Sequence, residues 1–492
     1  MRLTEILKNI DYRLLQGNLD HKIEALIYDS RKAVKNTVFI AMDGVYADGH
    51  QFINDAVEQG CQVIVLEKDI CMQKGITYIK VSDTRSALAH MSCSFFSHPS
   101  HELTVIGVTG TVGKTTSALM IYSILKEAGK KVGVIGTNGV YINDFYEETH
   151  NTTPESYELN RIMRLMRFHN CDYCVMEVSS QAFKMHRVDG IDFDYGIFTN
   201  LSPDHIGPNE HASFEEYRDC KKQLFQLCKI GLFNLDDSHA SEMMNQAACQ
   251  IYTYSTLKEA DLYAQHINLY QEPGHMGIRF ETGGLLKDFY TLDMPGRFNV
   301  YNALVSLFIC SQIGIDHADI KRALAHVHIA GRGEVIHVSD DYTVIIDYAH
   351  NGAAFESILN TVEEYKPNRV ICVYGMPGKR SKVRRIESGE AIARHHAYAV
   401  LTADDPRDEK VSDIALEIIN AMGHLSSDHY TVVENRKEAI YYALDHALKN
   451  DVILILGKGH ETHMVLENEV KVHYSDKESV ESYRKDHKEC VK

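Results

Sequence analysis

The sequence lacks any run of about 18 apolar residues, the length that a membrane-spanning helix needs. Its N-terminus has neither the long apolar core nor the small-residue cleavage site of a signal peptide. Internal repeats and low-complexity tracts are also missing from the sequence. We therefore expect a cytoplasmic protein that does not bind membranes.

Positive charge is also scarce. The chain has 51 Lys and Arg against 68 Asp and Glu, a net charge of −17 at pH 7. A chain with this balance repels phosphate backbones as a whole, although a local basic pocket is compatible with it. We expect no nucleic-acid partner.

The cysteines do not have the number or spacing of a disulfide framework. The 11 cysteines are too few and too scattered for a disulfide-stapled fold, and we interpret them as reduced thiols. Cys171 and Cys174 have the C-x2-C spacing of half a zinc site, but the sequence has no second pair of ligands that would complete it. We interpret these two residues as structural.

The chain does contain a regular alternation of short apolar runs and helical patterns. At about 150 residues per domain, 492 residues predict three domains. The alternation indicates α/β domains with largely parallel sheets. The predicted strands are Val38–Met42, Val63–Leu66, Tyr78–Val81, Thr104–Thr109, Lys131–Ile135, Tyr173–Val178, Tyr195–Thr199, Thr343–Asp347, Val370–Tyr374, Ala399–Thr402 and Val452–Leu456. A polar stretch at Ser97–His101 and the glycines around Arg332 place the domain boundaries, giving domains 1–100, 101–331 and 332–492.

A phosphate-binding loop follows the strand Thr104–Thr109. Its residues are Gly110, Thr111, Val112, Gly113, Lys114, Thr115 and Thr116, and a helical pattern begins there. A strand, glycine turn and helix start form a cradle for anions, with Lys114 reaching the β- and γ-phosphates and Thr115 binding Mg²⁺. The strict G-x4-G-K-[ST] pattern is not met, because position 108 is Val and the earlier glycine is Gly107. The alternative is a plain glycine turn with a solvated lysine. We predict ATP or GTP binding.

Further along the chain, three side chains are candidates for metal binding or catalysis. Glu177 ends an apolar strand, where an acid in a parallel sheet faces the ligand crevice. His205 follows another strand. Lys221 lies in the helix-like stretch Glu215–Leu227, on one face with Tyr217 and Leu224. Taken singly, each has an ordinary explanation: an acid at a strand end, a structural histidine and a solvated lysine.

The motifs together resemble the Mur ligase family over essentially the whole chain. They occur in the family's order: Asp29-Ser30-Arg31, Asp48–Phe52, Thr109–Thr116, Asn151–Pro154, Glu177–Ser180, Asn200–His205 and Asp347–His350. The resemblance implies a smaller N-terminal α/β domain that binds UDP, a central P-loop domain with a parallel sheet that binds ATP, and a C-terminal Rossmann-like domain that binds an amino acid.

The resemblance also implies an activity. The expected enzyme is an ATP-dependent amide ligase of peptidoglycan precursor synthesis that forms an acyl phosphate and then a carbon–nitrogen bond. Its expected substrates are UDP-N-acetylmuramoyl-L-alanyl-D-glutamate and a diamino acid, with ATP and Mg²⁺ as cofactors, and the expected state is a monomer. A folate-type ligase, a divergent paralogue with another donor or acceptor, and a P-loop protein that uses nucleotide as a switch are the alternatives.

By the same resemblance, residue roles can be assigned. ATP would be bound by Gly110, Thr111, Gly113, Lys114, Thr115, Thr116, Asn299, Asn302, Arg332 and Asp347. The UDP-muramoyl-dipeptide would be bound by Ser30, Asn151, Thr152, Thr153, Ser179 and Arg187. Two Mg²⁺ ions would be held by Thr115, Glu177, His205 and Lys221, the last as a carbamate (N6-carboxylysine). The catalytic residues would be Lys114, Glu177, His205 and Lys221.

The incoming amino acid would be selected by two boxes in the last domain. They are Asp404-Asp405-Pro406-Arg407 and Gly457-Lys458-Gly459-His460-Glu461, with Arg380 as a further arginine. An arginine fork binds the distal carboxylate of meso-diaminopimelate, which L-lysine lacks, and Glu461 would face the distal ammonium. The boxes favour diaminopimelate, but Asp405 replaces the family's Asn, so L-lysine remains the alternative.

The sequence departs from the family pattern at several places. They are Val112 in the phosphate loop, Gln181, Ile206-Gly207-Pro208, Asn351-Gly352 and Met376–Lys379. None of these departures removes Lys114 or an implied metal ligand.

Overall fold

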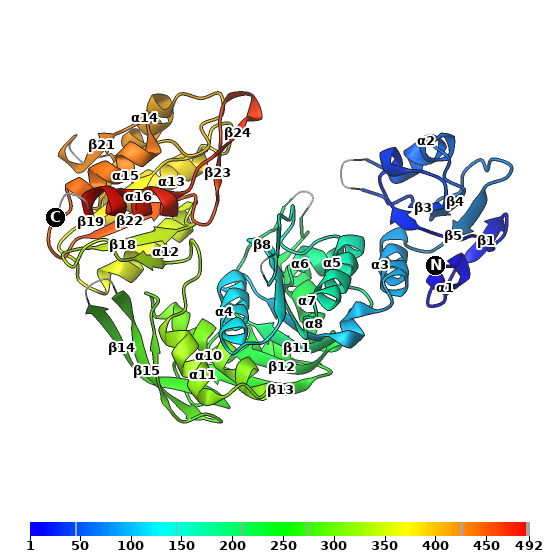
Figure 1. Ribbon diagram of the computed structural model, residues 1–492, viewed down its shortest axis with the longest axis horizontal. Coiled ribbons are helices and arrows are strands. Elements are labelled where there is room, and N and C mark those ends of the chain that lie inside the picture. The colour runs from blue at the N-terminus through cyan, green and yellow to red at the C-terminus, as the bar shows by residue number, and fades with distance from the viewer. Residues whose placement is uncertain (45–46, 144, 208–209, 273–274, 424–426, 489–492) are drawn as a thin grey trace. The chain divides into compact units, whose positions relative to one another are not determined.

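The computed structural model describes the 492-residue chain except residues 45–46, 144, 208–209, 273–274, 424–426 and 489–492 (Figure 1). The chain folds into two compact units. The first unit is Met1–Ser255 with Phe308–Ile315, and the second is Thr256–Leu307 with Asp316–Lys492. The boundaries expected at residues 100 and 331 stay a prediction.

The first unit begins with a five-stranded sheet in the order β1-β5-β4-β3-β2, parallel except at β1. Its strands are β1 (Arg13–Gln16), β2 (Ala25–Ile27), β3 (Thr37–Ile40), β4 (Val63–Leu66) and β5 (Thr77–Lys80). Its helices are α1 (Leu3–Ile6), η1 (Ser30–Lys32), η2 (Gly49–Phe52), α2 (Ile53–Glu58) and α3 (Thr84–Phe95). Side chains alternate between the faces of a strand, so Val38 and Ile40 pack with α1 and α3 while Phe39 packs with α2.

The second sheet of this unit carries the phosphate loop. Its strands run in the order β13-β12-β11-β6-β10-β7-β8-β9, and those from β13 to β7 are parallel. They are β6 (Thr104–Thr109), β7 (Val132–Gly136), β8 (Gly139–Ile142), β9 (Phe145–Glu147), β10 (Tyr173–Glu177), β11 (Phe193–Phe198), β12 (Cys228–Asn234) and β13 (Gln250–Ser255). The helices are η3 (Pro99–Glu102), α4 (Lys114–Glu127), α5 (Ser156–Phe168), α6 (Ser180–Lys184), α7 (Phe214–Lys222), α8 (Leu224–Leu227) and α9 (Ala240–Met244). One core cluster joins the sheet to α5, α6, α7 and α8.

The second unit contains the antiparallel strands β14 (Leu262–Glu272), β15 (His275–Gly284) and β16 (Phe289–Leu292). A six-stranded sheet follows, ordered β17-β18-β22-β19-β20-β21 and parallel except at β17. Its strands are β17 (Glu334–Ile336), β18 (Thr343–Asp347), β19 (Val370–Tyr374), β20 (Tyr398–Leu401), β21 (Tyr430–Val432) and β22 (Val452–Leu456), and β23 (His463–Val465) pairs with β24 (Lys471–His473).

Helices cover both faces of the six-stranded sheet. One core cluster includes residues of α12, α13 and α14, and another includes residues of α15 and α16. The helices of this part are α11 (His317–Ala325), α12 (Gly352–Glu363), α13 (Val383–Arg394), α14 (Val411–Met422), η4 (Ser427–His429), α15 (Arg436–Asp445), η5 (Glu467–Glu469) and α16 (Asp476–Lys488), and α10 (Phe298–Gln312) spans both units. The predicted α/β fold class is confirmed, and each predicted strand appears within two residues of its expected ends.

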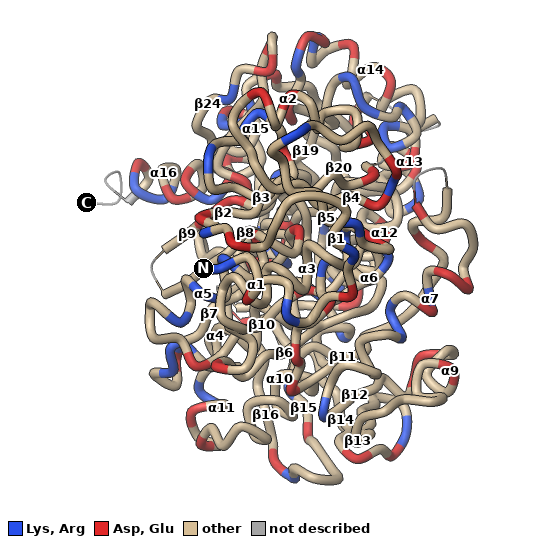
Figure 2. The backbone as a smooth tube through the Cα atoms, turned by 90° about the vertical axis from the view of Figure 1, so that its right-hand side faces the viewer, with Lys and Arg blue, Asp and Glu red and all other residues tan. Residues whose placement is uncertain are grey.

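Acidic and basic residues are interspersed along the backbone in the view of Figure 2. Across the described residues, no helix is both long and apolar enough to cross a bilayer. Every cysteine that the structure describes is a free thiol, and Cys171 and Cys174 are fully buried. Burial raises the pKa of both thiols, which opposes the thiolate form that zinc binding needs.

Candidate active site

The phosphate loop lies between β6 and α4, as the sequence predicts. Gly113 precedes the first residue of α4 with φ of 89°, in the left-handed region. Gly110 has φ of 147°, and a Cβ there would lie 2.0 Å from the Thr199 hydroxyl. Only glycine fits this close approach. The loop therefore presents backbone N–H groups at a helix start, the arrangement that binds phosphate.

Lys114 rests on the loop that it follows. Its Nζ donates to the carbonyl oxygens of Gly110 and Thr111, each at 2.9 Å. Its side chain also lines a cavity of about 560 Å³. The ammonium therefore lies at the loop, where it can turn toward an incoming phosphate.

Glu177 ends β10 and is buried. Its carboxylate accepts hydrogen bonds from the Thr115 hydroxyl at 2.9 Å and from the backbone N–H of Thr137 at 2.8 Å. A Cβ on Gly136 would lie 2.2 Å from the Glu177 Oε1 atom, so glycine is needed for this approach. A carboxylate and a hydroxyl side by side are oxygen ligands of the kind that Mg²⁺ prefers. Sequence reasoning missed Thr137 because no motif marks it.

Lys221 is a buried lysine, and the solvated-charge alternative for it is wrong. It lies on α7 with 2% of its surface exposed, and its Nζ donates to the Gly110 carbonyl at 2.8 Å. The Nζ also lies 4.5 Å from the centre of the Tyr217 ring. Burial, and then the Lys114 charge, lower the pKa of Lys221 well below its usual value. The structure thus favours a neutral amine at this position.

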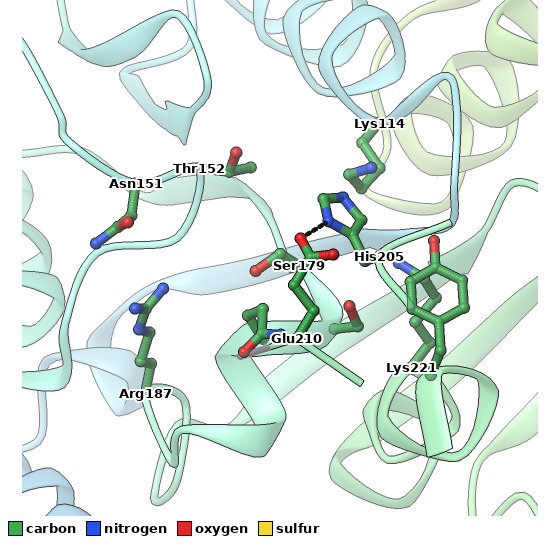
Figure 3. A pocket seen from close by; sticks show the side chains of 11 residues that line it. Lys114, Asn151, Thr152, Ser179, Arg187, His205, Glu210 and Lys221 are labelled. Atoms are coloured by element: carbon green, nitrogen blue, oxygen red, sulfur yellow. Dashed lines mark hydrogen bonds and ion pairs between the residues drawn. The ribbon is translucent and has the colours of Figure 1, made fainter. Parts of the chain in front are cut away.

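His205 lies in the loop after β11, with φ of 53°. Its Nδ1 is 2.9 Å from the Glu210 carboxylate, a pair drawn in Figure 3. Half of its side chain is exposed. Glu210 was missed because no motif marks it; it lies just beyond Ile206-Gly207-Pro208, where the sequence departs from the family pattern. Residues 208 and 209 lie outside the described residues.

The 560 Å³ cavity brings many of the predicted residues together. In Figure 3, Lys114, His205 and Lys221 lie on one side and Asn151 and Arg187 on the other. The lining residues are Lys114, Asn151, Thr152, Ser179, Ser180, Gln181, Arg187, His205, Glu210, Tyr217 and Lys221. In the described part of the chain, no group of three or more His, Cys, Asp or Glu side chains is arranged to hold a metal ion.

The predicted dipeptide-binding residues are held by one another. Thr153 is buried, and its hydroxyl donates to the Glu177 carbonyl at 2.9 Å. Arg187 donates to the Thr153 carbonyl at 3.1 Å and pairs with Glu155 at 2.7 Å. Ser30 does not line this cavity; it is the first residue of η1, the short helix between β2 and β3. A separate cavity of about 300 Å³ is lined there by Asp29 and Tyr28, among others.

The remaining predicted ATP residues lie in the second unit. The Asp347 carboxylate accepts from the backbone N–H groups of Gly333 at 2.7 Å and Ala349 at 2.8 Å. Burial raises the pKa of Asp347. The Arg332 guanidinium lies 5.0 Å from the centre of the Tyr348 ring. Asn302 donates to Asn299 at 2.8 Å, and both are buried.

The two predicted amino-acid boxes meet around Lys458. Its Nζ is fully buried and lies 2.9 Å from Asp405, 2.8 Å from Glu461 and 3.6 Å from Asp404. Burial raises the pKa of Asp404 to about 6. A Cβ on Gly457 would lie 2.2 Å from the Asp404 carboxylate, so the two loops touch. Three carboxyl groups thus surround one ammonium.

The two predicted arginines of this region differ in exposure. The Arg407 side chain is 11% exposed, donates to the Gly378 carbonyl at 3.2 Å and pairs with Glu469 at 3.2 Å. Arg380 is exposed, two residues beyond Gly378. Pro406 lies between Asp405 and Arg407, and its carbonyl would lie 2.0 Å from a Cβ on Gly378. The arginine loop therefore packs against the segment that carries Arg380.

Comparison with known proteins decides the family. The Mur ligase family catalytic-domain model matches residues 22–96, the Mur ligase middle-domain model residues 108–310, and the Mur ligase glutamate-ligase-domain model residues 331–459. The chain is 38% identical over 487 residues to the UDP-N-acetylmuramoyl-L-alanyl-D-glutamate–2,6-diaminopimelate ligase of Clostridium perfringens, covering 98% of this chain and 99% of that protein. The chain belongs to the Mur ligase family.

Solved structures agree with this placement. A UDP-N-acetylmuramoyl-L-alanyl-D-glutamate–2,6-diaminopimelate ligase superposes on this Mur ligase with a TM-score of 0.72 at 25% identity, over 99% of both chains. The MurF ligase of Thermotoga maritima in complex with ADP superposes with a TM-score of 0.58 at 18% identity, over 89% of this chain and 94% of that one, and shows the fold alone. This Mur ligase is an enzyme that forms carbon–nitrogen bonds, which excludes the alternative of a nucleotide-driven switch protein.

Proposed function

We propose that this Mur ligase joins meso-diaminopimelate to UDP-N-acetylmuramoyl-L-alanyl-D-glutamate with hydrolysis of ATP. The observation that carries the proposal is the similarity over 98% of the chain to a ligase of that name. The cavity that gathers the phosphate-loop lysine, a histidine and a buried lysine supports it. We further infer that the enzyme acts as a cytoplasmic monomer and binds neither nucleic acid nor membrane, in keeping with its −17 charge.

In this proposal the first step activates the glutamyl carboxylate. A carboxylate is a poor acyl donor, and phosphorylation makes phosphate its leaving group. Lys114, at the start of α4, would turn from the Gly110 carbonyl to the transferring phosphoryl group and neutralise its charge. Asn151, Thr152, Ser179 and Arg187 line the same cavity and would hold the dipeptide beside it.

The residues present fit Mg²⁺. Glu177 and the Thr115 hydroxyl offer neighbouring oxygen atoms, and His205 lies at the same cavity. Lys221 has the two properties that carbamate formation needs: a buried site and a lowered pKa, which favours the neutral, nucleophilic amine. When bound, Mg²⁺ would stabilise the negative charge of the phosphoryl group during transfer.

The second step needs an amino acid whose amine attacks the activated carboxyl. The carboxyl groups of Asp404, Asp405 and Glu461 outnumber the single ammonium of Lys458. This excess of negative charge suits the distal ammonium of a diamino acid. Arg407, beside the Gly378 carbonyl, would pair with the distal carboxylate of diaminopimelate. L-lysine shares the ammonium but not the carboxylate, and it is the alternative acceptor.

The deciding experiment is a ligation assay. Purified protein is incubated with ATP, Mg²⁺, UDP-N-acetylmuramoyl-L-alanyl-D-glutamate and either meso-diaminopimelate or L-lysine, and the products are weighed by mass spectrometry. We expect the tripeptide product with diaminopimelate. Product with L-lysine alone would correct the acceptor, and no product with any diamino acid would reject the proposal.

Binding calorimetry separates the folate-type alternative. A folate-type ligase does not bind a UDP-sugar, whereas this proposal requires that the dipeptide nucleotide bind. The variant Ser30→Ala tests whether the first sheet contributes to that binding. The matched control is Ser86→Ala, whose hydroxyl donates to Asp189 at 3.2 Å instead.

A further inference from the structure

A buried arginine joins the two loops that carry the predicted amino-acid boxes. Arg436 is the first residue of α15, and its guanidinium is completely buried. Its Nη1 donates to the Ala403 carbonyl at 3.2 Å, and its Nη2 donates to the Leu456 carbonyl at 2.8 Å. Ala403 immediately precedes Asp404, and Leu456 immediately precedes Gly457. One side chain thus contacts the backbone just ahead of both boxes.

The guanidinium is itself fixed in place. Its Nε and Nη2 donate to the two carboxylate oxygens of Asp476, at 2.8 and 2.9 Å. Asp476 is the first residue of α16, and the Tyr474 hydroxyl donates to it at 3.0 Å. A bidentate arginine–carboxylate pair restricts both side chains geometrically. The pair therefore orients Nη1 toward the Ala403 carbonyl and the second N–H of Nη2 toward the Leu456 carbonyl.

We propose that Arg436 is a positioning residue for the acceptor amino acid, holding the loops of Asp404–Arg407 and Lys458–Glu461 in a fixed relation through the Ala403 and Leu456 carbonyls. It touches none of the reacting groups. The inference rests on the proposed function, since it takes these two loops as the acceptor site. Lysine cannot replace arginine here, because one ammonium lacks the planar fork that reaches Asp476 and two carbonyls together.

The structure offers a matched control at the opposite end of β22. Arg369 precedes β19 and pairs with Asp451, which precedes β22, at 2.7 Å from its Nη2 and 3.2 Å from its Nε. Its Nη2 also donates to the His446 carbonyl at 2.8 Å. Arg369→Lys thus disturbs a similar bidentate pair in the same sheet, but at the amino ends of the strands rather than beside the acceptor boxes.

The test compares Arg436→Lys with Arg369→Lys in the full-length enzyme. We expect Arg436→Lys to raise KM for the acceptor by about tenfold or more, because small misplacements of binding groups are costly, and to leave KM for ATP within twofold. Hydrogen exchange followed by mass spectrometry should show faster exchange at 404–407 and 457–461. Arg369→Lys should change neither the acceptor KM nor the exchange of these loops.

Two further variants keep the inference testable if Arg436→Lys does not fold. Tyr474→Phe removes a single hydrogen bond to Asp476, and Asp476→Asn removes its charge. We expect loop exchange and acceptor KM to increase in the order Tyr474→Phe, Asp476→Asn, Arg436→Lys. Equal rises in KM for acceptor and ATP, or loop exchange unchanged in all three variants, would overturn the inference. If the wild-type enzyme ligates no diamino acid, the proposed function fails, while the exchange data still report whether Arg436 orders the loops.

Discussion

The amine of Lys221 lies 2.8 Å from the carbonyl oxygen of Gly110, so a residue of α7 is hydrogen-bonded to the first glycine of the phosphate loop. The two residues are 111 positions apart in the chain. The contact brings a buried amine with a lowered pKa to the point where Lys114 also rests. The proposed chemistry at Lys221 and the proposed nucleotide binding at the loop would therefore take place at one spot.

Replacing Lys221 should nearly abolish ligation. Lys221→Ala removes the amine that we propose becomes a carbamate, and we expect product formation to fall on the order of a hundredfold or more. Added bicarbonate should not restore it, since no amine remains to react. The matched control is the neighbouring Lys222→Ala, which should keep wild-type rates. Activity of Lys221→Ala close to wild type would reject the carbamate role.

The buried amine of Lys221 should also change how the free energy of unfolding depends on pH. With the pKa of Lys221 lowered in the folded state, the unfolded chain binds more protons between that pKa and about 10.5. The free energy of unfolding should therefore rise with pH across this window. As the pH falls from about 10.5 to the folded-state pKa, the stability gained at high pH should be lost, and below that pKa no further loss is expected from Lys221. Lys221→Met lacks the titrating group, so its unfolding free energy should rise less with pH than that of the wild type.

Urea unfolding in CO₂-free buffer with a chelator measures this difference. We expect Lys221→Met to be the more stable protein at pH 7, with the gap narrowing toward pH 9.5, because burying a lone charge is costly. Other titrating groups are common to both proteins and cancel in the comparison. Parallel pH dependences would show that Lys221 does not titrate abnormally.

A side-chain clamp on the phosphate loop should govern nucleotide affinity. The Asn200 amide donates to the Val112 carbonyl and accepts from the Val112 N–H, both at 2.9 Å. We expect Asn200→Ala to raise KM for ATP by about tenfold, as two hydrogen bonds are lost, and to change acceptor KM little. Asn160→Ala is the control: its amide donates to Ser156 in α5, away from the loop. Unchanged KM for ATP would mean that the clamp is not needed.

Arg407 should determine preference among diamino acids. We expect Arg407→Ala to lower kcat/KM for meso-diaminopimelate by about a hundredfold, the value of a charge-assisted bidentate contact, with a much smaller change for L-lysine. The competition assay weighs both products from an equimolar mixture. Arg394→Ala, which removes an exposed arginine of α13 paired with Glu356, is the control. Equal losses for the two amino acids would assign Arg407 a structural role instead.

The sequence predicts the parallel strands well for a physical reason. Strands such as β6 and β22 are buried on both faces and therefore read as continuous apolar runs. The antiparallel strands β14 and β15 escaped prediction. In β14, exposed and buried positions are mixed over 11 residues, so no apolar run marks it.

The candidate site was predictable only where a motif carries the chemistry. Lys114 and Glu177 follow from their positions at strand and helix ends. The side-chain contacts that hold the neighbouring loops do not follow from any motif: Asn200 contacts Val112 across 88 positions of the chain, and Arg436 contacts Asp476 across 40. Such pairs depend on how distant elements meet. Lys221 was identified from family resemblance, because its burial cannot be inferred from a helix pattern alone.

The carbonyl of Gly110 accepts from two lysines at once, Lys114 at 2.9 Å and Lys221 at 2.8 Å. After burial, the charge of Lys114 is the next cause of the lowered pKa of Lys221. A nucleotide that draws Lys114 away from this oxygen must then change the proton affinity of Lys221, since the two equilibria are linked. The heat of nucleotide binding to the unmodified enzyme should accordingly depend on the ionisation enthalpy of the buffer, because protons are exchanged at Lys221 as Lys114 moves.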